Sequence, residues 1–540
     1  PLMIQPKIPP EDPRGKTMNL SYECVEKNAV RIPNRLAIID GSTGETLTYS
    51  EMNAQVNSIA NALKQMGVQK GERVAIYLRN VPEFLLSFMA ITKLGAIAVP
   101  FNIMLKKMEI EYILNHSESR ILFGMAEETA ENVLPILDKL PKLEKIIIVR
   151  SENSQASNPI EIPFSSLLEH SESLEAVDLQ GEDALSILYT SGTTGKPKGV
   201  VSTHASWLSQ VILNAGQVVP MSEEDGIITG APLFHVYVVL TALPTLWSGA
   251  CFVTLERFFP DKALELITKY KLSHFMGTPT MWAYMIEDYL KNQGKYDISS
   301  LRLGQAAGSS FPAELGRQVE EVFKIDLVEC YGATESSSTV THTRYGHFIP
   351  GTSGWPARDW QVRIVDFEGN DVASGEVGEL WIKGPGVLKR YWNDAENTAA
   401  KIKDGWWKSG DLAYVRGESP TDCLLYLVDR KDDMLVCGGY NIYPSEVENY
   451  LAQNPKILQS VVIGIPDPLK GEIPKAFVVL APGQNATEEE MVRWSKENVA
   501  AYKAPRQFEF TTMDELPKTA TGKILKRELK RMEAEKSKTA

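Results

Sequence analysis

Strand-like and helix-like segments alternate along much of this 540-residue sequence, and this alternation constrains the fold more than any other feature. Residues 72–78 (ERVAIYL) predict a strand, residues 81–95 (VPEFLLSFMAITKLG) a helix that stops at a glycine, and residues 96–101 (AIAVPF) a strand again. Apolar runs within 119–149 continue the pattern. Strands that alternate with helices pair mainly in parallel, so the sequence predicts an α/β fold with parallel-rich αβα layers.

The pattern changes near residue 350, where short strands separated by glycine turns predict a β-rich subdomain over about 350–430. A compact α+β pattern follows. We therefore expect a large N-terminal domain over residues 1–430 and a small C-terminal domain over residues 431–540. In the small domain, Ser445 with Glu448 three residues later has the spacing of a capping box, which predicts that Ser445 is a helix N-cap.

Composition excludes several classes of protein. A net charge of −13 argues against a nucleic-acid-binding protein and against an anionic membrane surface as main partner. No apolar run reaches the ~18 residues of a membrane span, and the N-terminal residues lack the apolar region of a signal peptide. The five cysteines and seven histidines show no metal-ligand spacing. We expect a cytoplasmic protein with reduced thiols.

Residues 189–201 (YTSGTTGKPKGVV) gather hydroxyl, glycine and lysine residues directly after an apolar run. Glycines let backbone N–H groups approach phosphate oxygens closely, and hydroxyls and lysines are further donors. The G-x-x-x-x-G-K-[ST] register fails from Gly192 and from Gly195, so this is not a loop of that class. The stretch indicates a nucleotide site of another kind, and the structural alternative is a plain glycine turn between strands.

The full stretch resembles the phosphate-binding loop of the adenylate-forming superfamily, which includes acyl-CoA synthetases, peptide-synthetase adenylation domains and beetle luciferases. Four further segments resemble motifs of that family in its order and extend the resemblance over nearly the whole chain: 331–337 (YGATESS), 406–415 (WWKSGDLAYV), 428–448 and 516–529 (LPKTATGKILKREL). The resemblance implies an AMP-forming acid–thiol ligase, closest to fatty-acyl or aryl-CoA ligases. It also implies ATP, Mg²⁺ and CoA as cofactors.

The resemblance assigns the ATP- and AMP-binding residues. They are Thr190, Ser191, Gly192, Thr193, Thr194, Lys198, Tyr331, Gly332, Asp411 and Arg430. The first six would hold the departing phosphates, and Tyr331 would lie against the adenine. Asp411 would accept from the ribose hydroxyls, with Arg430 on the same side. On the residues alone, an N-cap or turn aspartate and an interface ion pair are the alternatives for Asp411 and Arg430.

The resemblance also assigns the catalytic residues, which are Lys523, Glu335, Thr334 and His235. Thr334 would hold the α-phosphate, and Glu335 would hold Mg²⁺, which prefers carboxylate oxygen. Lys523, in a threonine/glycine turn, would bridge the substrate carboxylate and the α-phosphate.

The second half-reaction implies a movement of the small domain. The family's hinge residue corresponds to Asp432, and Gly438 and Gly439 would line the path of CoA. A tight turn is the structural alternative for the two glycines.

The acyl pocket is expected to include His235, Tyr237, Met276, Gly277, Ala307 and Gly308. His235 stands where amino-acid-activating members carry an aspartate, which argues against an α-amino acid. Alone, it could also be a satisfied core histidine. The segment 304–310 (GQAAGSS) departs from the family's commoner Gly-Gly-Ala-Pro type and leaves the pocket shape open. A medium- or long-chain fatty acid is our first choice and an aryl or cyclic acid our second.

The acceptor is expected to be CoA, because no carrier domain follows within the sequence, although a carrier protein or an amine would use the same adenylate. A non-catalytic acyl- or nucleotide-binding protein is disfavoured by the joint presence of Glu335, Asp411, Arg430 and Lys523. The expected partners are a small carboxylic acid and CoA. A homodimer is left open.

Overall fold

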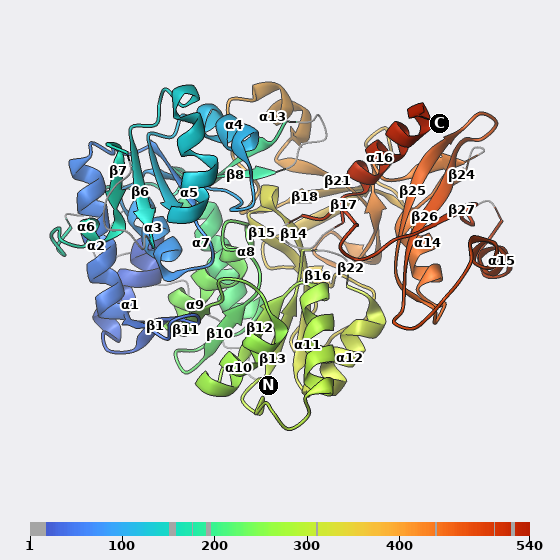
Figure 1. Ribbon diagram of the computed structural model, residues 1–540, viewed down its shortest axis with the longest axis horizontal. Helices are drawn as coiled ribbons and strands as arrows, with labels where there is room; N and C mark the ends of the chain where they lie inside the picture. The colour runs from blue at the N-terminus through green and yellow to red at the C-terminus, as the bar shows by residue number, and fades with distance from the viewer. Residues whose placement is uncertain are drawn as a thin grey trace. The chain divides into compact units, whose positions relative to one another are not determined.

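The computed structural model describes residues 18–150, 158–174, 177–190, 196–308, 311–437, 440–501, 503–519 and 524–539. The chain divides into two compact units (Figure 1). The large unit is Pro1–Gln361 with Ile382–Trp407, and the small unit is Val362–Trp381 with Lys408–Ala540. The predicted domain boundary near residue 430 falls inside the small unit. That the residues after this boundary move as a separate domain stays a prediction.

One sheet of the large unit has the strand order β19-β9-β8-β4-β3-β5-β6-β7. Its strands are β3 (Arg73–Tyr77), β4 (Ile97–Pro100), β5 (Ile121–Met125), β6 (Lys145–Val149), β7 (Glu161–Pro163), β8 (Ala184–Thr190), β9 (Lys198–Thr203) and β19 (Arg390–Tyr391). From β8 to β7 the neighbouring strands are parallel, whereas β9 is antiparallel to both β8 and β19. The parallel pairing predicted from residues 72–149 is confirmed.

Another sheet of the large unit has the order β16-β15-β14-β13-β12-β10-β11-β1-β2. Its strands are β1 (Leu36–Asp40), β2 (Thr46–Thr48), β10 (Gly226–Thr229), β11 (Cys251–Thr254), β12 (His274–Gly277), β13 (Leu303–Ala306), β14 (Asp326–Ala333), β15 (Ser338–His342) and β16 (Trp355–Pro356). Strands from β1 to β14 along this order are parallel, and the strands at both ends are antiparallel.

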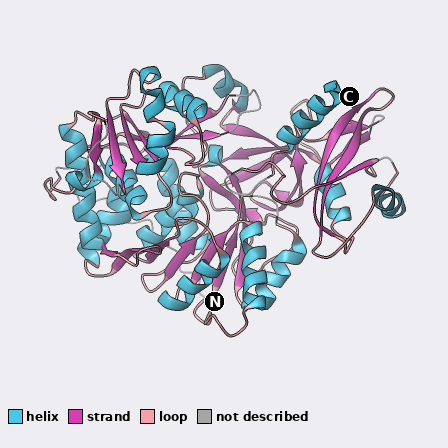
Figure 2. Ribbon diagram, in the orientation of Figure 1, coloured by secondary structure: helices cyan, strands magenta, loops and turns pink. Residues whose placement is uncertain are grey.

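Helices cover and separate these sheets (Figure 2). They are α1 (Lys27–Arg31), α2 (Tyr49–Gln65), α3 (Pro82–Lys93), α4 (Lys107–Ser117), α5 (Ala126–Asn132), α6 (Phe164–Leu167), α7 (His204–Leu213), α8 (Tyr237–Leu240), α9 (Ala242–Ser248), α10 (Pro260–Tyr270), α11 (Pro279–Lys291), α12 (Ala313–Phe323) and α13 (Ala395–Lys401). The predicted helix at 81–95 is α3. It is buried along most of its length, contacts β1 and β4, and is followed by Gly95 at φ 70°. Helices α10, α11 and α12 share an apolar core with β10 to β14 and lie together in Figure 1.

The small unit combines a β-rich part with an α+β part. In the first, β17 (Gln361–Val365), β18 (Gly378–Lys383) and β21 (Trp406–Ser419) are neighbours, and β22 (Asp422–Arg430) pairs with β21. In the second, the order is β24-β23-β26-β25, with β27 beside β26. Its elements are β23 (Leu435–Cys437), β24 (Tyr440–Ile442), β25 (Ile457–Asp467), β26 (Gly471–Leu480), β27 (Gln507–Phe510), α14 (Pro444–Leu451), α15 (Glu488–Asn498) and α16 (Lys526–Thr539). A small parallel-and-antiparallel sheet with packed helices confirms the α+β expectation.

The predicted capping box at Ser445 is wrong. Helix α14 begins two residues earlier than predicted, with Tyr443 as N-cap and Pro444 as its first residue, because proline's fixed φ suits the first helical position. The amide of Ser445 instead donates to the carboxylate of Asp429, at 2.8 Å. Glu448 accepts from the Val462 amide at 2.7 Å and pairs with Lys526 at 3.0 Å, so it ties α14 to β25 and α16.

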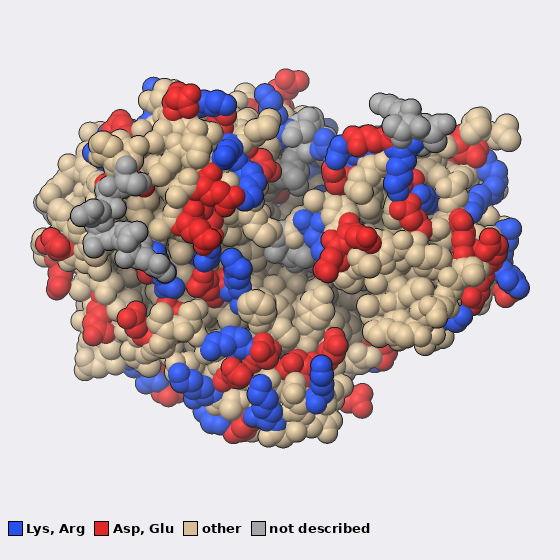
Figure 3. Space-filling model, viewed as in Figure 1, with Lys and Arg blue, Asp and Glu red and all other residues tan. Residues whose placement is uncertain are grey.

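Charged side chains of both signs lie on the molecular surface. On the face drawn in Figure 3, cationic and anionic side chains are interspersed, and the cations do not form a continuous patch there. Such mixing does not favour a polyanionic partner. Within the residues that the structure describes, we find no helix with the length and apolar character of a bilayer span.

Candidate active site

The ends of the glycine-rich loop are held by paired strands. Thr190 ends β8 and Lys198 begins β9, and the two residues face each other across this antiparallel pair. The hydroxyl of Tyr112, on α4, donates to the carbonyl of Pro197 at 3.0 Å. The intervening Ser191, Gly192, Thr193 and Thr194 lie outside the described residues. The structure thus fixes the two strand ends from which the predicted phosphate-binding residues extend.

Lys198 is oriented by a segment from a distant part of the sequence. Its Nζ donates to Oδ1 of Asn397 at 2.8 Å and lies 5.6 Å from the ring centroid of Tyr391. Tyr391 is on β19, which pairs with β9, and Asn397 is on α13. A cation is attracted to the face of an aromatic ring, so both contacts hold the ammonium group in place.

The predicted adenine and magnesium residues lie at a sharp turn. Tyr331 and Gly332 lie near the end of β14, and Thr334 and Glu335 begin the short 3₁₀ helix Thr334–Ser336 that precedes β15. Tyr331 and Thr334 are buried. A Cβ added to Gly332 would lie 1.6 Å from the backbone oxygen of Ser338, so only glycine fits there. The close approach of β14 and β15 therefore explains Gly332 without any nucleotide.

We expect Gly332→Ala to destabilise the protein by about 3 kcal/mol, because the new methyl group must push a strand backbone aside. Denaturant unfolding would measure the change. Gly181→Ala is the control, since a methyl there would meet only side-chain atoms, the nearest at 3.1 Å. Equal unfolding midpoints for the two variants would show that the turn at Gly332 can open, contrary to this structure.

Glu335 is tied to the same segment that orients Lys198. Its Oε1 accepts from the hydroxyl of Tyr391 at 3.2 Å, and its carbonyl accepts from the amide of Leu388 at 2.7 Å. Burial and then the nearby Glu335 carboxylate raise the pKa of Tyr391 well above its usual value, so the phenol stays a hydrogen-bond donor. Tyr391 therefore lies between Lys198 and Glu335.

The residues present fit a magnesium ion held partly by substrate. Across the described ranges, the structure has no group of three or more His, Cys, Asp or Glu residues placed to hold a metal. Mg²⁺ in nucleotide sites often takes one or two carboxylates and completes its shell with phosphate oxygens and water. The half-buried carboxylate of Glu335 matches the protein's share of such a shell.

The predicted ribose residues lie together in the small unit. Asp411 on β21 and Arg430 on β22 face each other across the antiparallel pair, with 3.6 Å between Arg430 Nε and Asp411 Oδ1. Asp411 is largely covered, while the guanidinium is more than half exposed. Arg430 therefore pairs with Asp411 inside one sheet of the small unit, and a ligand could draw on both side chains.

Three of the predicted acyl-pocket residues lie next to a fourth, Tyr237. This buried residue begins α8, and its hydroxyl lies 3.0 Å from the carbonyl of Gly277 and 3.5 Å from that of Ala307. A Cβ on Gly308 would lie 3.6 Å from the Tyr237 ring. On Gly277 it would instead meet Phe275, in the core beneath α11. Gly277 therefore contacts Tyr237 through its carbonyl. The absence of a side chain at Gly277 does not open space toward Tyr237.

Met276 and His235 complete the predicted pocket set. Met276 is buried on β12, and its carbonyl accepts from the Thr229 hydroxyl at 2.8 Å. His235 is half-buried in the turn before α8, where its amide donates to the carbonyl of Pro232. Asn80 braces this turn: its amide donates to the Ala231 carbonyl at 2.9 Å and its oxygen accepts from the Leu233 amide at 2.8 Å.

The residues predicted for the second half-reaction are only partly described. Asp432 is exposed in the turn between β22 and β23, and its carbonyl accepts from Lys530 at 3.5 Å. Gly438, Gly439 and Lys523 lie outside the described residues. The chain on either side of 520–523 is tied together, since Lys518 bridges to Ile524 and the Leu525 amide donates to the Pro517 carbonyl at 2.8 Å.

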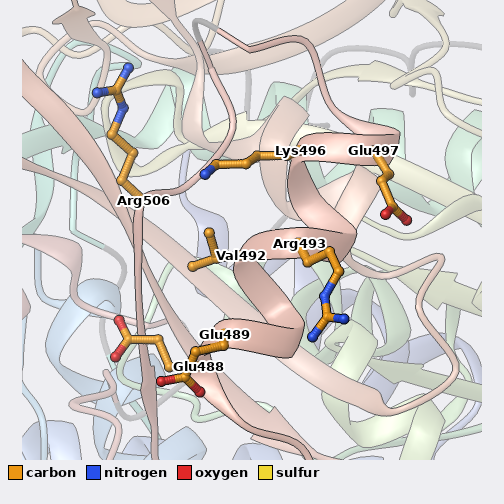
Figure 4. A pocket seen from close by; sticks show the side chains of 7 residues that line it. All are labelled: Glu488, Glu489, Val492, Arg493, Lys496, Glu497 and Arg506. Atoms are coloured by element: carbon orange, nitrogen blue, oxygen red, sulfur yellow. The ribbon is translucent and has the colours of Figure 1, made fainter.

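A cavity of about 500 Å³ lies elsewhere in the small unit, along α15 (Figure 4). Its lining side chains are Glu488, Glu489, Val492, Arg493, Lys496, Glu497 and Arg506. Charges of both signs line an open groove, and none of the described site residues is among them. We do not assign this groove to the candidate active site.

Sequence reasoning missed Tyr391, Asn397 and Asn80. Asn80 had a usable signal, because it closely follows β3, and ligands gather at the carboxyl ends of parallel strands. Tyr391 and Asn397 had none in a single sequence, since β19 is only two residues long and its partner strand is far away in the chain.

Comparisons with known proteins agree on one family. Residues 25–392 match the model of the AMP-binding enzymes, and residues 446–523 match that of the AMP-binding enzyme C-terminal domain. A long-chain-fatty-acid–CoA ligase from Bacillus subtilis is 34% identical, over 94% of this chain and 93% of the relative. A feruloyl-CoA synthase from Amycolatopsis is 33% identical, over 92% and 96%. The crystal structure of an anthranilate CoA ligase with anthranoyl-AMP has a TM-score of 0.86 and 31% identity, covering 97% of this chain and 98% of that one.

Proposed function

Because the chain belongs to the family of AMP-binding enzymes, we propose that it joins a medium- or long-chain fatty acid to CoA. It is an AMP-forming acid–thiol ligase that uses ATP, Mg²⁺ and CoA. The fatty acid and the residue roles below are the parts that we propose.

The observation that carries the proposed roles is the placement of Lys198 and Glu335 on two sides of Tyr391. Attack of a carboxylate on ATP joins two anions, so the site must supply positive charge and donors around the phosphates. Lys198 would hold the departing phosphates. Mg²⁺ bound at Glu335 would neutralise further phosphate charge.

The remaining described residues would position the nucleotide. Tyr331 would stack on the adenine, Thr334 would donate to the α-phosphate, and Asp411 with Arg430 would hold the ribose. A carboxylate oxygen bonds to the α-phosphorus, and the bond between that phosphorus and the bridging oxygen breaks, which releases pyrophosphate. Lys523 would stabilise the charge that develops in this step.

In the second step the sulfur of CoA bonds to the acyl carbon, and AMP leaves with the oxygen that came from the carboxylate. The thiol proton is lost to solvent or a base. We infer that rotation about Asp432 brings the C-terminal domain, residues 431–540, from the first step to the second, and that Gly438 and Gly439 line the thiol's path.

The preference for a fatty acid rests on the surroundings of Tyr237. The buried Met276 and the covered ring of Tyr237 would offer apolar walls, and the tyrosine hydroxyl lies 3.0 Å from the Gly277 carbonyl and 3.5 Å from that of Ala307. His235 supplies no carboxylate for an α-ammonium group. The fatty-acid relative supports this choice, whereas the feruloyl and anthranilate relatives support the aryl alternative.

The cytoplasmic location stays a proposal, as does a homodimer.

A panel of acids tests the substrate proposal. We expect octanoate, laurate or palmitate to exceed benzoate, ferulate and anthranilate in kcat/KM by at least about tenfold, a difference of ~1.4 kcal/mol. AMP and thioester would be measured together, with CoA omitted or replaced by an amine as control. Preference for an aromatic acid would replace our first choice by the second. Strong pyrophosphate exchange with an α-amino acid would overturn our reading of His235.

A further inference from the structure

Tyr391 makes two different contacts with residues of the proposed site. Its hydroxyl donates to Oε1 of Glu335 at 3.2 Å, and its ring faces Nζ of Lys198 at 5.6 Å. The side chain is buried, with 3% of its surface exposed. A single rigid side chain therefore touches both the carboxylate proposed for Mg²⁺ and the cation proposed for the departing phosphates.

The backbone around Tyr391 is fixed from two directions. Tyr391 faces Val200 in the antiparallel pairing of β19 with β9, which ties it to the strand that Lys198 begins. Its amide donates to the Thr398 hydroxyl at 3.0 Å, which ties it to α13. Asn397 on that helix accepts from Lys198 at 2.8 Å. The ring is thus held by the same elements that hold its two partners.

The two partners come from separate parts of the large unit. Lys198 begins a strand of one sheet, whereas Glu335 lies in the turn after β14 of the other. No contact between Lys198 and Glu335 themselves is needed for them to share a fixed spacing, because each contacts Tyr391. The backbone bond from the Leu388 amide to the Glu335 carbonyl, at 2.7 Å, strengthens this link three residues before the tyrosine.

We propose that Tyr391 is a positioning residue that sets the metal-binding carboxylate of Glu335 through its hydroxyl and the phosphate-binding ammonium of Lys198 through its ring. This inference rests on the roles given to Glu335 and Lys198 in the proposed function. Outer-shell partners of metal ligands change metal affinity by about 10- to 100-fold when removed. The hydroxyl and the ring have separate effects because they contact different partners.

Two substitutions separate these effects. Tyr391→Phe removes the hydroxyl and keeps the ring, so the Mg²⁺ concentration for half-maximal adenylation should rise about tenfold. Inhibition by pyrophosphate, which would report on Lys198, should stay within about twofold, or ~0.4 kcal/mol. Tyr391→Leu removes both the hydroxyl and the aromatic ring, and it should weaken the binding of both Mg²⁺ and pyrophosphate. Binding of Mn²⁺ to the enzyme–ATP complex, followed by electron paramagnetic resonance, gives a readout that does not depend on turnover.

Tyr296→Phe is the matched control, because Tyr296 is also buried and its hydroxyl donates to a carboxylate, that of Asp288, at 2.8 Å. It should change neither the Mg²⁺ response nor the pyrophosphate response. Conversion of a supplied acyl-adenylate to thioester should be unchanged in Tyr391→Phe, because that step does not use the Mg²⁺–ATP that Glu335 is proposed to hold. Such selectivity separates positioning from a general loss of folding, which thermal unfolding would also reveal.

Glu335→Gln distinguishes failure of the inference from failure of the proposed function. If Glu335→Gln weakens Mn²⁺ binding and Tyr391→Phe does not, the positioning role of Tyr391 is wrong and the proposed function stands. If Glu335→Gln leaves Mn²⁺ binding unchanged, the metal role of Glu335 is wrong and the inference falls with it. Loss of both half-reactions in folded Tyr391→Phe would also contradict a positioning role in adenylation.

Discussion

Replacing Lys523 by alanine should lower the rate of acyl-adenylate formation by about 10²–10⁴, the scale for the loss of one group that stabilises a transition state. The lysine would bridge two anions that must approach each other, and alanine leaves their charge uncompensated. Pyrophosphate release in single-turnover experiments with ATP and acid would measure the change. Conversion of a supplied acyl-adenylate to thioester should continue, because the proposed rotation removes Lys523 from the site before that step.

Another lysine of the small unit provides a control for charge alone. Lys475→Met removes a buried cation that pairs with Glu509 at 2.8 Å and Glu533 at 2.6 Å. This variant should change the free energy of unfolding, whereas the ratio of the two half-reaction rates should stay close to that of the wild type. An equal fall of both half-reactions in folded Lys523→Ala, or no fall in either, would remove the assignment of Lys523.

Asp432→Pro should slow thioester formation and largely spare adenylation, which is the opposite of the effect expected for Lys523→Ala. A hinge residue must adopt two backbone conformations, whereas proline holds φ near −65° and lacks an N–H. We expect the variant to be held in the adenylation orientation. Pyrophosphate release should then persist within about tenfold, or ~1.4 kcal/mol, while thioester formation falls much further. The pair of half-reaction rates on the same preparation is the measurement.

Asp432→Ala is the control for the side chain, because it keeps the backbone free to rotate. The carboxylate is exposed, and the contact from Lys530 is to the main-chain carbonyl, so this variant should keep both rates near those of the wild type. Equal losses in Asp432→Pro would mean an ordinary loop position or an unfolded protein. Circular dichroism would distinguish these two outcomes.

The parallel core of the fold could be predicted because its signal is local. Residues 72–101 carry apolar strand, helix and strand in succession, and the structure has β3, α3 and β4 there. The cap of α14 could not be assigned correctly from spacing alone. Ser445 and Glu448 fit a capping box, but Pro444 starts the helix earlier, and both side chains find tertiary partners. Tertiary contacts with Asp429, Val462 and Lys526 are invisible in a local pattern.

The positions of candidate site residues could be predicted where the residues belong to one long sequence motif. Tyr331, Thr334 and Glu335 follow one another along the chain, and the turn after β14 places them together. Asp411 and Arg430 were expected on the same side of the ribose, and they face each other on β21 and β22. Tyr391 and Asn397 could not be predicted, because the residues that they contact lie far away in the sequence and no periodic pattern connects them.

The central claim is that this chain activates a carboxylic acid by forming an acyl-adenylate. Its most direct test uses a fatty acid whose carboxylate carries the heavy stable isotope of oxygen, incubated with ATP, Mg²⁺ and CoA. Because AMP leaves with the oxygen that attacked the α-phosphorus, mass spectrometry should find one labelled oxygen in each AMP and none in pyrophosphate. Label in inorganic phosphate, with ADP in place of AMP, would indicate an acyl phosphate and contradict the account.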